Sequence, residues 1–364
     1  MGKVAIFHDY FDEIGGAEAT VLNMAKALNA KIYTTNIDRD KINRLGFSKI
    51  QIESVGCVPN KRIVKQVCTA LKFYFSKNKK YDKYVFVGSY SIFAAKPNRE
   101  NYWFCISPLR GLYDLRFQKK SLFSNWLFKE IQIYYDQKAV SKIKTIFVNS
   151  VNTMKRVKQF YNRDSEVIYS PVDVSKFYNK KSKNYSLSVN RIDPYKRIEI
   201  QIEAFRKLPE ENLIIVGGAS AEFEDYFLKL KKNAPQNVKF LGSIFNENEI
   251  VKLYSECKTF IATAENEDFG KTVIEAMAAG KIVIAGEEGG YRETVIDGQT
   301  GFLIKDINSD KLAKKISEIS ELLRNKEKEF KRNSIEQSKK FDKKYFYKKI
   351  REKIIPERCV GTFH

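Results

Sequence analysis

The stretch TFIATAENEDFGKTVIEAMAAGKIVIA, residues 259–285, contains the structural unit that recurs along the chain. A short apolar run at 259–262 is followed by a polar loop with one glycine, a helix-like segment at 273–279 and a second apolar run at 282–285. Two short apolar runs joined through a helix are typical of parallel strands, because a parallel pair needs a long crossover connection. The stretch therefore predicts a parallel sheet covered by helices.

The same order of strand, loop and helix recurs on the N-terminal side of this stretch and continues beyond it. We expect strands at residues 4–7, 32–34, 84–87, 102–106, 146–149, 185–189, 213–216 and 238–241. We expect helices at residues 17–28, 153–160, 198–205 and 312–323. This alternation predicts an α/β fold of two doubly wound, Rossmann-like sheets, with ligands at the carboxyl ends of the strands.

A polar and basic stretch at residues 173–184 separates the two predicted sheets. The chain of 364 residues is long enough for two domains of ordinary size. We therefore expect an N-terminal domain at residues 1–172, a linker at 173–184 and a C-terminal domain at 185–340.

Positive charge is concentrated in the first half of the chain. Residues 1–182 carry 32 basic and 15 acidic side chains, whereas residues 183–364 carry 33 and 29, and the formal net charge is +21. A basic domain suits nucleic acid, an anionic membrane surface or a phosphorylated substrate. On charge alone, a solvated lysine-rich surface is an equally good interpretation.

Two segments of the first half combine basic and aromatic residues. Residues 61–80 contain seven basic and no acidic side chains, with Ile63, Val67 and Leu71 along one helical face, and residues 117–135 add further aromatics. This combination is typical of a helix that lies on an anionic membrane surface. The alternative is that these aromatic side chains belong to the core.

Cysteine, histidine and acidic residues give no sign of a metal site. The five cysteines form no C-x-x-C pair, and the only histidines are His8 and His364. The acidic pair in DRD at 38–40 precedes a helix-like stretch and is interpreted as a helix cap. No apolar run is long enough to span a bilayer, and residues 1–9 lack the apolar core of a signal peptide. We expect a reduced, cytoplasmic protein without a bound metal.

Two carboxylates, Glu267 and Glu275, lie eight positions apart across the junction between a loop and the helix expected at 273–279. Gly270 allows a ligand to approach the backbone closely, and free N–H groups near Lys271 and Thr272 can hold an anion. Glu275 could then reach a sugar hydroxyl of the same ligand. Without further information, an acidic loop before a plain helix is the more frequent interpretation.

Two further loops carry residues that suit phosphate groups. Arg191 and Lys196 directly follow the strand expected at 185–189, where they could bind a diphosphate, although a solvated basic turn is the alternative. Gly15 and Gly16 lie between the first strand and the first helix, where phosphate can approach a helix N-terminus. This glycine pair is neither G-x-G-x-x-G nor a P-loop, so its signal is weak.

In combination, these motifs resemble one known family. Together with the E-x7-E element, the chain contains HDY at 8–10, GGAE at 15–18, VIYSPVD at 167–173, VKFLG at 238–242 and GGYRETV at 289–295. The set resembles the retaining GT-B glycosyltransferases of family four, over nearly the whole chain. The resemblance implies two Rossmann-like domains facing across a cleft, with acceptor bound by the first and donor by the second. It also implies that a last helix, within residues 341–364, crosses back to the first domain.

The resemblance also implies roles for individual residues. Arg191 and Lys196 would hold the donor diphosphate, and Glu267 would contact the donor sugar. The other expected donor contacts are Glu275 at the ribose, Phe269, Gly270, Lys271, Thr272, Gly15, Gly16 and Ile244. The family transfers a sugar with retention and without a bound metal.

One position departs from the nearest-looking subgroup of the family. That subgroup has C-H-T-P-x-R-Y after the fourth strand, whereas this chain has CISPLRG at 105–111, so that Ile106 stands at the histidine position. Ser107, Arg110 or His8 would then contact the sugar or the acceptor. For His8, a packed residue at a strand end is an equally good interpretation.

We therefore expect a retaining hexosyltransferase that moves a mannose- or glucose-type sugar from a GDP- or UDP-linked donor to a glycan acceptor. The acceptor is expected to be polyprenyl-linked, and the protein to bind the cytoplasmic face of the membrane peripherally during cell-surface polysaccharide or glycoprotein glycan synthesis. The alternatives are a sugar-nucleotide epimerase on the same fold, a catalytically inactive sugar-binding subunit and a nucleic-acid-binding protein. No nucleic-acid recognition motif accompanies the basic residues.

Overall fold

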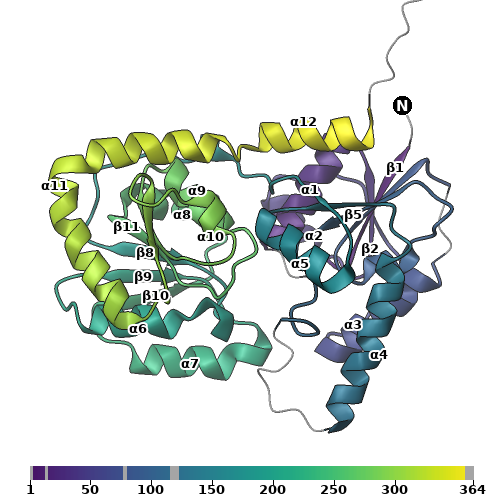
Figure 1. Ribbon diagram of the computed structural model, residues 1–364, viewed down its shortest axis with the longest axis horizontal. Coiled ribbons are helices and arrows are strands. Elements are labelled where there is room, and N and C mark those ends of the chain that lie inside the picture. Colours follow the sequence, from purple (N-terminus) through teal and green to yellow (C-terminus); the bar gives the residue numbers. More distant parts are fainter. Residues whose placement is uncertain (1–2, 13–14, 77–79, 115–122, 357–364) are drawn as a thin grey trace, which may run out of the picture. The chain divides into compact units, whose positions relative to one another are not determined.

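The computed structural model describes residues 3–12, 15–76, 80–114 and 123–356 of the chain. The chain folds into two compact units (Figure 1). Unit 1 comprises residues 1–171 and 344–364, and unit 2 comprises residues 172–343. Both units contain a parallel sheet with helices on its two faces, which confirms the predicted α/β fold of two Rossmann-like sheets.

Seven parallel strands form the sheet of unit 1, in the order β3-β2-β1-β4-β5-β6-β7. They are β1 (Val4–His8), β2 (Lys31–Thr34), β3 (Ile52–Ser54), β4 (Lys83–Val87), β5 (Asn101–Cys105), β6 (Thr145–Val148) and β7 (Glu166–Val167). Successive side chains of a strand point to opposite faces, and β1 is buried on both. Val4 and Ile6 contribute to the core on one face, whereas Ala5 and Phe7 contribute to the core on the other.

Helices cover both faces of this sheet. They are α1 (Gly16–Leu28), α2 (Arg39–Arg44), α3 (Arg62–Tyr74), η1 (Ser91–Ala94), α4 (Phe123–Val140), α5 (Val151–Tyr161) and α12 (Lys343–Ile354). Residues of α1 and α12 belong to one core, and residues of α3, η1, α4 and α5 belong to the other. Ser150 caps α5 by accepting the Thr153 N–H at 2.9 Å, as its position before a helix predicts.

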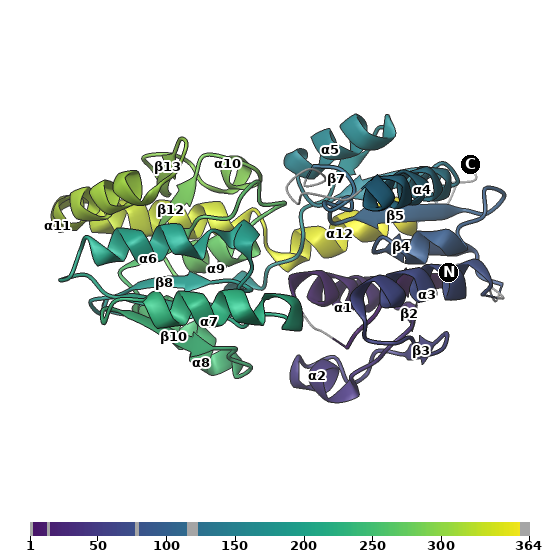
Figure 2. The ribbon, with the colours of Figure 1, turned by 90° about the horizontal axis from the view of Figure 1, so that it is seen from below.

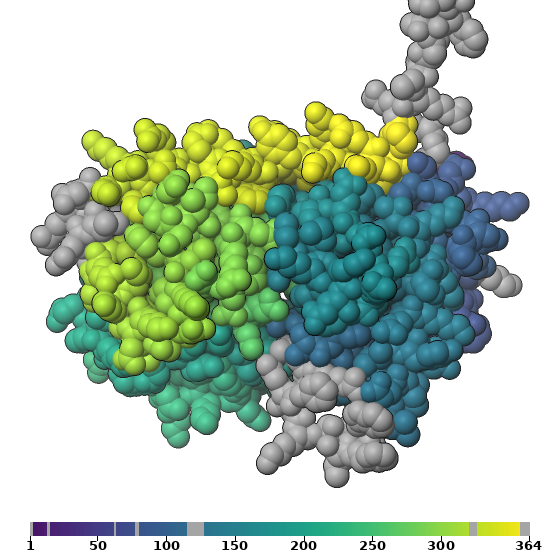
Figure 3. Space-filling model, in the orientation of Figure 1, coloured from purple at the N-terminus to yellow at the C-terminus, as the bar shows by residue number. Residues whose placement is uncertain are grey.

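The C-terminal helix α12 is an integral part of unit 1. Its side chains Phe346 and Ile350 lie in the same core as α1, and the Tyr347 hydroxyl donates to Asn23 Oδ1 at 2.6 Å. Arg351 Nε also donates to the Ala27 carbonyl at 2.7 Å. Figure 3 shows this helix, in yellow, lying along the surface of unit 1.

Six parallel strands form the sheet of unit 2, in the order β10-β9-β8-β11-β12-β13. They are β8 (Ser186–Val189), β9 (Leu213–Val216), β10 (Val238–Gly242), β11 (Thr259–Ala262), β12 (Ile282–Gly286) and β13 (Gly301–Ile304). The strands predicted at 259–262 and 282–285 are β11 and β12, and they pair in parallel. Residues 259–285 thus form a unit of strand, helix and strand, as predicted.

The helices of unit 2 lie on both faces of its sheet (Figure 2). They are η2 (Val174–Lys176), η3 (Pro194–Lys196), α6 (Ile198–Arg206), η4 (Ala221–Phe223), α7 (Glu224–Asn233), α8 (Glu247–Glu256), α9 (Lys271–Ala278), α10 (Tyr291–Thr294) and α11 (Ser309–Lys339). Residues of α6, α7 and α11 share one core with Ile261 and Ile284, whereas α8 and α9 pack on the opposite face.

Residues 173–184, which we expected to be a linker, belong to unit 2. Two of their polar side chains contact the unit: Asn179 Nδ2 donates to the Ala279 carbonyl at 2.8 Å, and the exposed Lys183 forms an ion pair with Glu256 at 2.6 Å. The boundaries between the units fall between residues 171 and 172 and between 343 and 344, near the expected domain end at 172 and the expected start of the last segment at 341.

The acidic pair at 38–40 caps a helix, as predicted. Asp38 is the N-cap of α2, and its Oδ1 accepts the Lys41 N–H at 3.1 Å. Asp40 lies in the first turn of the same helix, where a negative charge is favourable. Among the described residues, no group of three or more His, Cys, Asp and Glu side chains is arranged to hold a metal ion.

The amphipathic helix expected within 61–80 is α3, and its apolar face is exposed. Ile63 and Leu71 are exposed to 59% and 50%, whereas Phe73 is fully buried against the sheet. The neighbouring helix α4 likewise exposes Leu127 and Tyr134. The core interpretation of the aromatic side chains is therefore wrong for Tyr134 and right for Phe73. Residues 117–122, which were part of the same prediction, lie outside the described residues.

Candidate active site

The E-x7-E element spans the loop after β11, which carries Glu267, and helix α9, which carries Glu275, at the carboxyl edge of the unit 2 sheet. Gly270 is the N-cap of α9 and has a φ of 84°, a left-handed conformation that favours glycine. A Cβ at this position would lie 2.8 Å from the ring of Tyr291, so the close packing requires glycine as well. Phe269 is buried, whereas Lys271 and Thr272, which begin the helix, are partly exposed.

Lys196 and Glu267, which the sequence proposed as partners at one ligand, are in direct contact. Lys196 Nζ lies 2.6 Å from Glu267 Oε2, and each side chain is 19% exposed. The two residues come from different loops, one after β8 and the other after β11, which are adjacent strands. Asp193 fixes the first loop by accepting the Tyr195 N–H at 3.0 Å.

Arg191 lies in the loop after β8 and is exposed. The neighbouring Ile192 anchors this loop, because its side chain is fully buried and its N–H donates to the Gly218 carbonyl at 2.9 Å. For Arg191 itself, no side-chain partner is found within the described part of the chain. The backbone around Arg191 is therefore fixed at the sheet edge by Ile192, whereas no described residue holds the Arg191 guanidinium.

Glu275 is the second carboxylate of the E-x7-E element and points toward α8. The Tyr254 hydroxyl donates to Glu275 Oε2 at 2.8 Å. Burial raises the pKa of Glu275 above its usual value, although the nearby Lys271 and this hydrogen bond act in the opposite direction. Tyr254 is fully buried and lies 21 positions away in the sequence, so no local pattern could have identified it.

Ile244, expected near the nucleotide base, follows β10 and is partly exposed. The end of β10 pairs with the end of β9, because the Gly217 N–H donates to the Gly242 carbonyl at 2.8 Å. Gly218 lies against Ser243, the residue after Gly242, because a Cβ on Gly218 would be 2.6 Å from Ser243 Oγ. The loop that carries Ile244 is thus at the same sheet edge as Arg191.

In unit 1, the expected glycine loop precedes α1. Gly15 is the N-cap of α1 and Gly16 its first residue, and both are exposed. The Gly15 N–H already donates to Glu18 Oε2 at 2.8 Å. The Glu18 carboxylate therefore already binds one of the backbone N–H groups that we expected to be available to a phosphate. Residues 13–14 of this loop lie outside the described residues.

His8 is buried at the end of β1. Its Nδ1 lies 2.6 Å from the Val87 carbonyl, so Nδ1 carries the proton, and Nε2 lies 3.5 Å from Glu18 Oε1. Burial alone would lower the pKa of His8, but the adjacent Glu18 carboxylate outweighs it, and the pKa is raised above its usual value. His8 is therefore a packed residue at a strand end, and its contact with the sugar or the acceptor stays a prediction.

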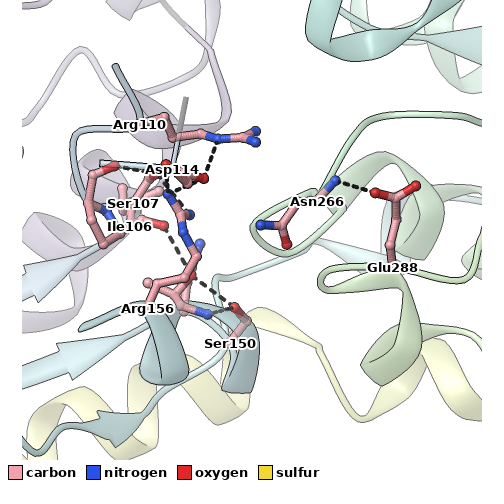
Figure 4. Close-up of polar contacts among 11 residues, drawn as sticks. Ile106, Ser107, Arg110, Asp114, Ser150, Arg156, Asn266 and Glu288 are labelled. Atoms are coloured by element: carbon pink, nitrogen blue, oxygen red, sulfur yellow. Dashed lines mark hydrogen bonds and ion pairs between the residues drawn. The ribbon is translucent and has the colours of Figure 1, made fainter. Parts of the chain in front are cut away.

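Ser107 and Arg110 follow β5 and meet two residues that the sequence did not single out (Figure 4). Arg110 Nε and Arg156 Nη2 both lie 3.1 Å from Asp114 Oδ2, and Arg156 Nη1 donates to Ser107 Oγ at 3.4 Å. Arg156 comes from α5 and is almost completely buried. The arrangement places two cations on one carboxylate and leaves a positive charge at this edge of the unit 1 sheet.

Sequence comparison now assigns the part of the chain that contains the E-x7-E element. Residues 172–339 match the profile of the family described as Glycosyl transferases group 1. This segment of the chain belongs to that family. The match spans nearly all of unit 2 and confirms the resemblance to family-four glycosyltransferases that the motifs indicated.

Relatives cover the chain to different extents. An uncharacterized glycosyltransferase of Methanocaldococcus jannaschii is 30% identical over 185 residues, which cover 50% of each chain. The alpha-1,3/1,6-mannosyltransferase ALG2 of Dictyostelium discoideum is 24% identical over 366 residues, 83% of this chain and 86% of ALG2. In the first three curated relatives, which are 28–30% identical, the aligned part spans only 24–50% of their length.

A solved structure matches both units of the fold. HepE of Anabaena, crystallised in complex with UDP and glucose, superimposes with a TM-score of 0.78 over 97% of this chain and 99% of HepE. The two sequences are 20% identical, so the likeness concerns the fold. It agrees with the two Rossmann-like sheets of GT-B glycosyltransferases.

Proposed function

We propose that the chain is a retaining glycosyltransferase that moves a hexose from a nucleoside-diphosphate sugar to a glycan acceptor. The observation that carries this proposal is the Lys196–Glu267 ion pair beside the N-terminus of α9. A cation, a carboxylate and the N-terminal end of a helix meet there, and this combination suits a diphosphate and a sugar. Membership of residues 172–339 in the group 1 family supports the same reaction class.

In the proposed reaction, the bond between the anomeric carbon and the diphosphate oxygen breaks. A bond to the acceptor hydroxyl oxygen forms on the same face of the sugar, and the hydroxyl proton passes to the leaving phosphate. Lys196 and Arg191 would balance the charge that develops on the diphosphate, in place of a metal ion. Binding of the diphosphate would draw Lys196 away from Glu267 and leave that carboxylate for the sugar hydroxyls.

Donor and acceptor are proposed from the relatives. ALG2 is named a mannosyltransferase, and HepE was solved with UDP and glucose, so we propose a GDP- or UDP-linked mannose or glucose as donor. Another relative is named for a mannosyl transfer to a glycan on PP-Dol. We therefore propose a polyprenyl-linked glycan as acceptor, bound through unit 1.

The exposed apolar side chains of α3 and α4 support a location on the cytoplasmic face of a membrane. Exposed leucine, isoleucine and tyrosine side chains on a strongly basic chain suit the interface of an anionic bilayer. No described helix is long and apolar enough to cross a membrane. Flotation with liposomes tests this location: recovery should require anionic lipid, and equal recovery with neutral lipid would contradict it.

Thermal shift and turnover together test the reaction. GDP, UDP and ADP are screened first, because a ligand that binds only the folded state raises the melting temperature. The best nucleotide then defines the sugar donors for a transfer assay with a lipid-linked glycan, with and without a chelator. Turnover that needs the acceptor and survives chelation is expected. Product formed from the donor alone would instead indicate an epimerase.

A further inference from the structure

Two ion pairs lie next to each other at the sheet edge of unit 2. Lys196 pairs with Glu267, and the next residue, Arg197, pairs with Glu288, which follows β12. Arg197 Nε also donates to the Thr263 carbonyl at 2.7 Å. The turn after β8 is therefore fastened both to the loop after β11 and to the loop after β12.

Glu288 bridges these loops with its two carboxylate oxygens. Oε1 contacts Arg197, whereas Oε2 accepts the N–H of Asn266 at 2.9 Å, as Figure 4 shows for the second contact. Asn266 directly precedes Glu267, and Arg197 directly follows Lys196. One carboxylate thus holds the sequence neighbours of both members of the proposed catalytic pair.

The backbone at both contacts is in a conformation that needs support. Arg197 and Asn266 have φ values of 49° and 46°, in the left-handed region that is uncommon for residues other than glycine. Such conformations persist only where the surroundings impose them. Glu288 contacts both residues, so its carboxylate is one of the groups that stabilise this geometry.

The glycines after Glu288 bring its loop into direct contact with the Glu267 backbone. The Gly290 N–H donates to the Glu267 carbonyl at 2.7 Å. A Cβ at Gly289 would lie 2.4 Å from the same carbonyl oxygen, so a larger residue would separate the loops. The backbone of Glu267 is therefore fixed from the β12 side, next to the point where Glu288 holds Asn266.

From these contacts we infer that Glu288 is a positioning residue, whose carboxylate keeps Lys196 and Glu267 aligned by clamping Arg197 and the Asn266 N–H. The inference rests on the proposed glycosyltransferase function. Glu288 is not expected to touch the reacting atoms.

Glu288→Gln tests the inference, with Glu287→Gln as its matched control. Glutamine keeps the size of the side chain and can still accept the Asn266 N–H, but it lacks the charge that holds Arg197. Glu287 is the adjacent residue, and its carboxylate lies 4.0 Å from the exposed Arg292. We expect Glu288→Gln to lower kcat about 10-fold, because a charged hydrogen bond is lost, and Glu287→Gln to leave it within about 2-fold. Affinity for UDP or GDP, measured by calorimetry, should change less than about 2-fold in both variants.

A double-mutant cycle separates positioning from a general loss of structure. If Glu288 acts through Glu267, then Glu288→Gln should have almost no further effect on kcat in a Glu267→Gln background. Amide hydrogen exchange of residues 263–270 should be faster in Glu288→Gln and unchanged in Glu287→Gln. Equal kcat and exchange in the two single variants, or the same loss of kcat in both backgrounds, would overturn the inference. Absence of turnover in the wild type would overturn the proposed function instead, and the exchange data would still decide whether the clamp exists.

Discussion

The candidate residues of the two units are held in different ways. In unit 2, Lys196 and Glu267 neutralise each other directly across two adjacent strand ends. In unit 1, Arg110 is held by Asp114 and His8 lies against Glu18, so each candidate has a partner outside the candidate set. A ligand that binds both Lys196 and Glu267 can therefore replace their mutual ion pair. In unit 1, a ligand must instead bind Arg110 or His8 while Asp114 and Glu18 remain in contact with them. Under the proposed function, we therefore expect unit 2 to carry the charge chemistry and unit 1 to offer a preformed surface.

The largest expected effect comes from removing the cation of the unit 2 pair. Lys196→Ala should reduce kcat about 1000-fold, because the departing diphosphate loses a preorganised positive charge. The measurement is sugar transfer at saturating donor. Lys207→Ala is the control, since Lys207 is a surface lysine of the same unit that pairs with Asp310, and it should change kcat less than about 2-fold. Equal activity of both variants would contradict the proposed role of Lys196 in unit 2.

The next effect concerns a buried carboxylate of unit 1. Asp136, on α4, accepts the hydroxyls of Tyr113 and Tyr161 at 2.7 and 2.8 Å, and burial raises its pKa to about 6. In the unfolded chain the pKa of an aspartate is about 3.9, so the folded state binds this proton more tightly. The stability that the group contributes is fully present below about pH 4 and is lost as the pH rises through 6.

Asp136→Asn removes this titration without changing the size of the side chain. Relative to the wild type, the variant should therefore gain about 2 kcal/mol of unfolding free energy between pH 4 and pH 8. Urea unfolding of both proteins at pH 4, 6 and 8 measures the difference. A constant difference across that range would show that Asp136 is ionised in the folded state throughout, and unit 1 would then contain no buried neutral carboxyl at this position.

A smaller effect separates ligand binding from stability within unit 2. Tyr254→Phe removes the hydrogen bond to Glu275, and Tyr185→Phe removes an equivalent bond, of 2.9 Å, to the Leu253 carbonyl. Each variant should lose about 1 kcal/mol of stability. Only Tyr254→Phe should weaken binding of UDP or GDP, by about 5-fold, because Glu275 is the proposed ribose contact. Calorimetry with both variants measures this, and equal binding would remove Glu275 from the donor site.

The sequence predicted those parts of the molecule that depend on neighbouring residues. Strand β11, helix α9, the Ser150 cap and the Asp38 cap follow from local patterns, and all are present. The E-x7-E element was recognisable because its residues share one loop and one helix. The sheets followed because alternating strands and helices leave few other arrangements.

The partners of the candidate residues could not be predicted, because they come from distant segments. Glu288, Tyr254 and Arg156 reach the site through tertiary contacts that leave no periodic pattern in the sequence. The expected linker at 173–184 was wrong for a related reason. Its polar composition suggested a solvated segment, but Asn179 uses its side chain to bind a backbone carbonyl of α9's C-terminal end.

The smallest effect on stability is expected on the outer face of α3 in unit 1. Leu71→Ser should change the unfolding free energy by less than about 0.5 kcal/mol, because the side chain is already half exposed. Phe73→Ala, two residues along, should cost about 3 kcal/mol, since Phe73 is fully buried in the core. Liposome flotation should give the opposite order, with Leu71→Ser weakening recovery on anionic vesicles and Phe73→Ala, assayed under conditions where it is folded, leaving it unchanged. If Leu71→Ser binds vesicles as the wild type does, Leu71 makes no membrane contact, and the proposed role of the exposed α3 face is contradicted.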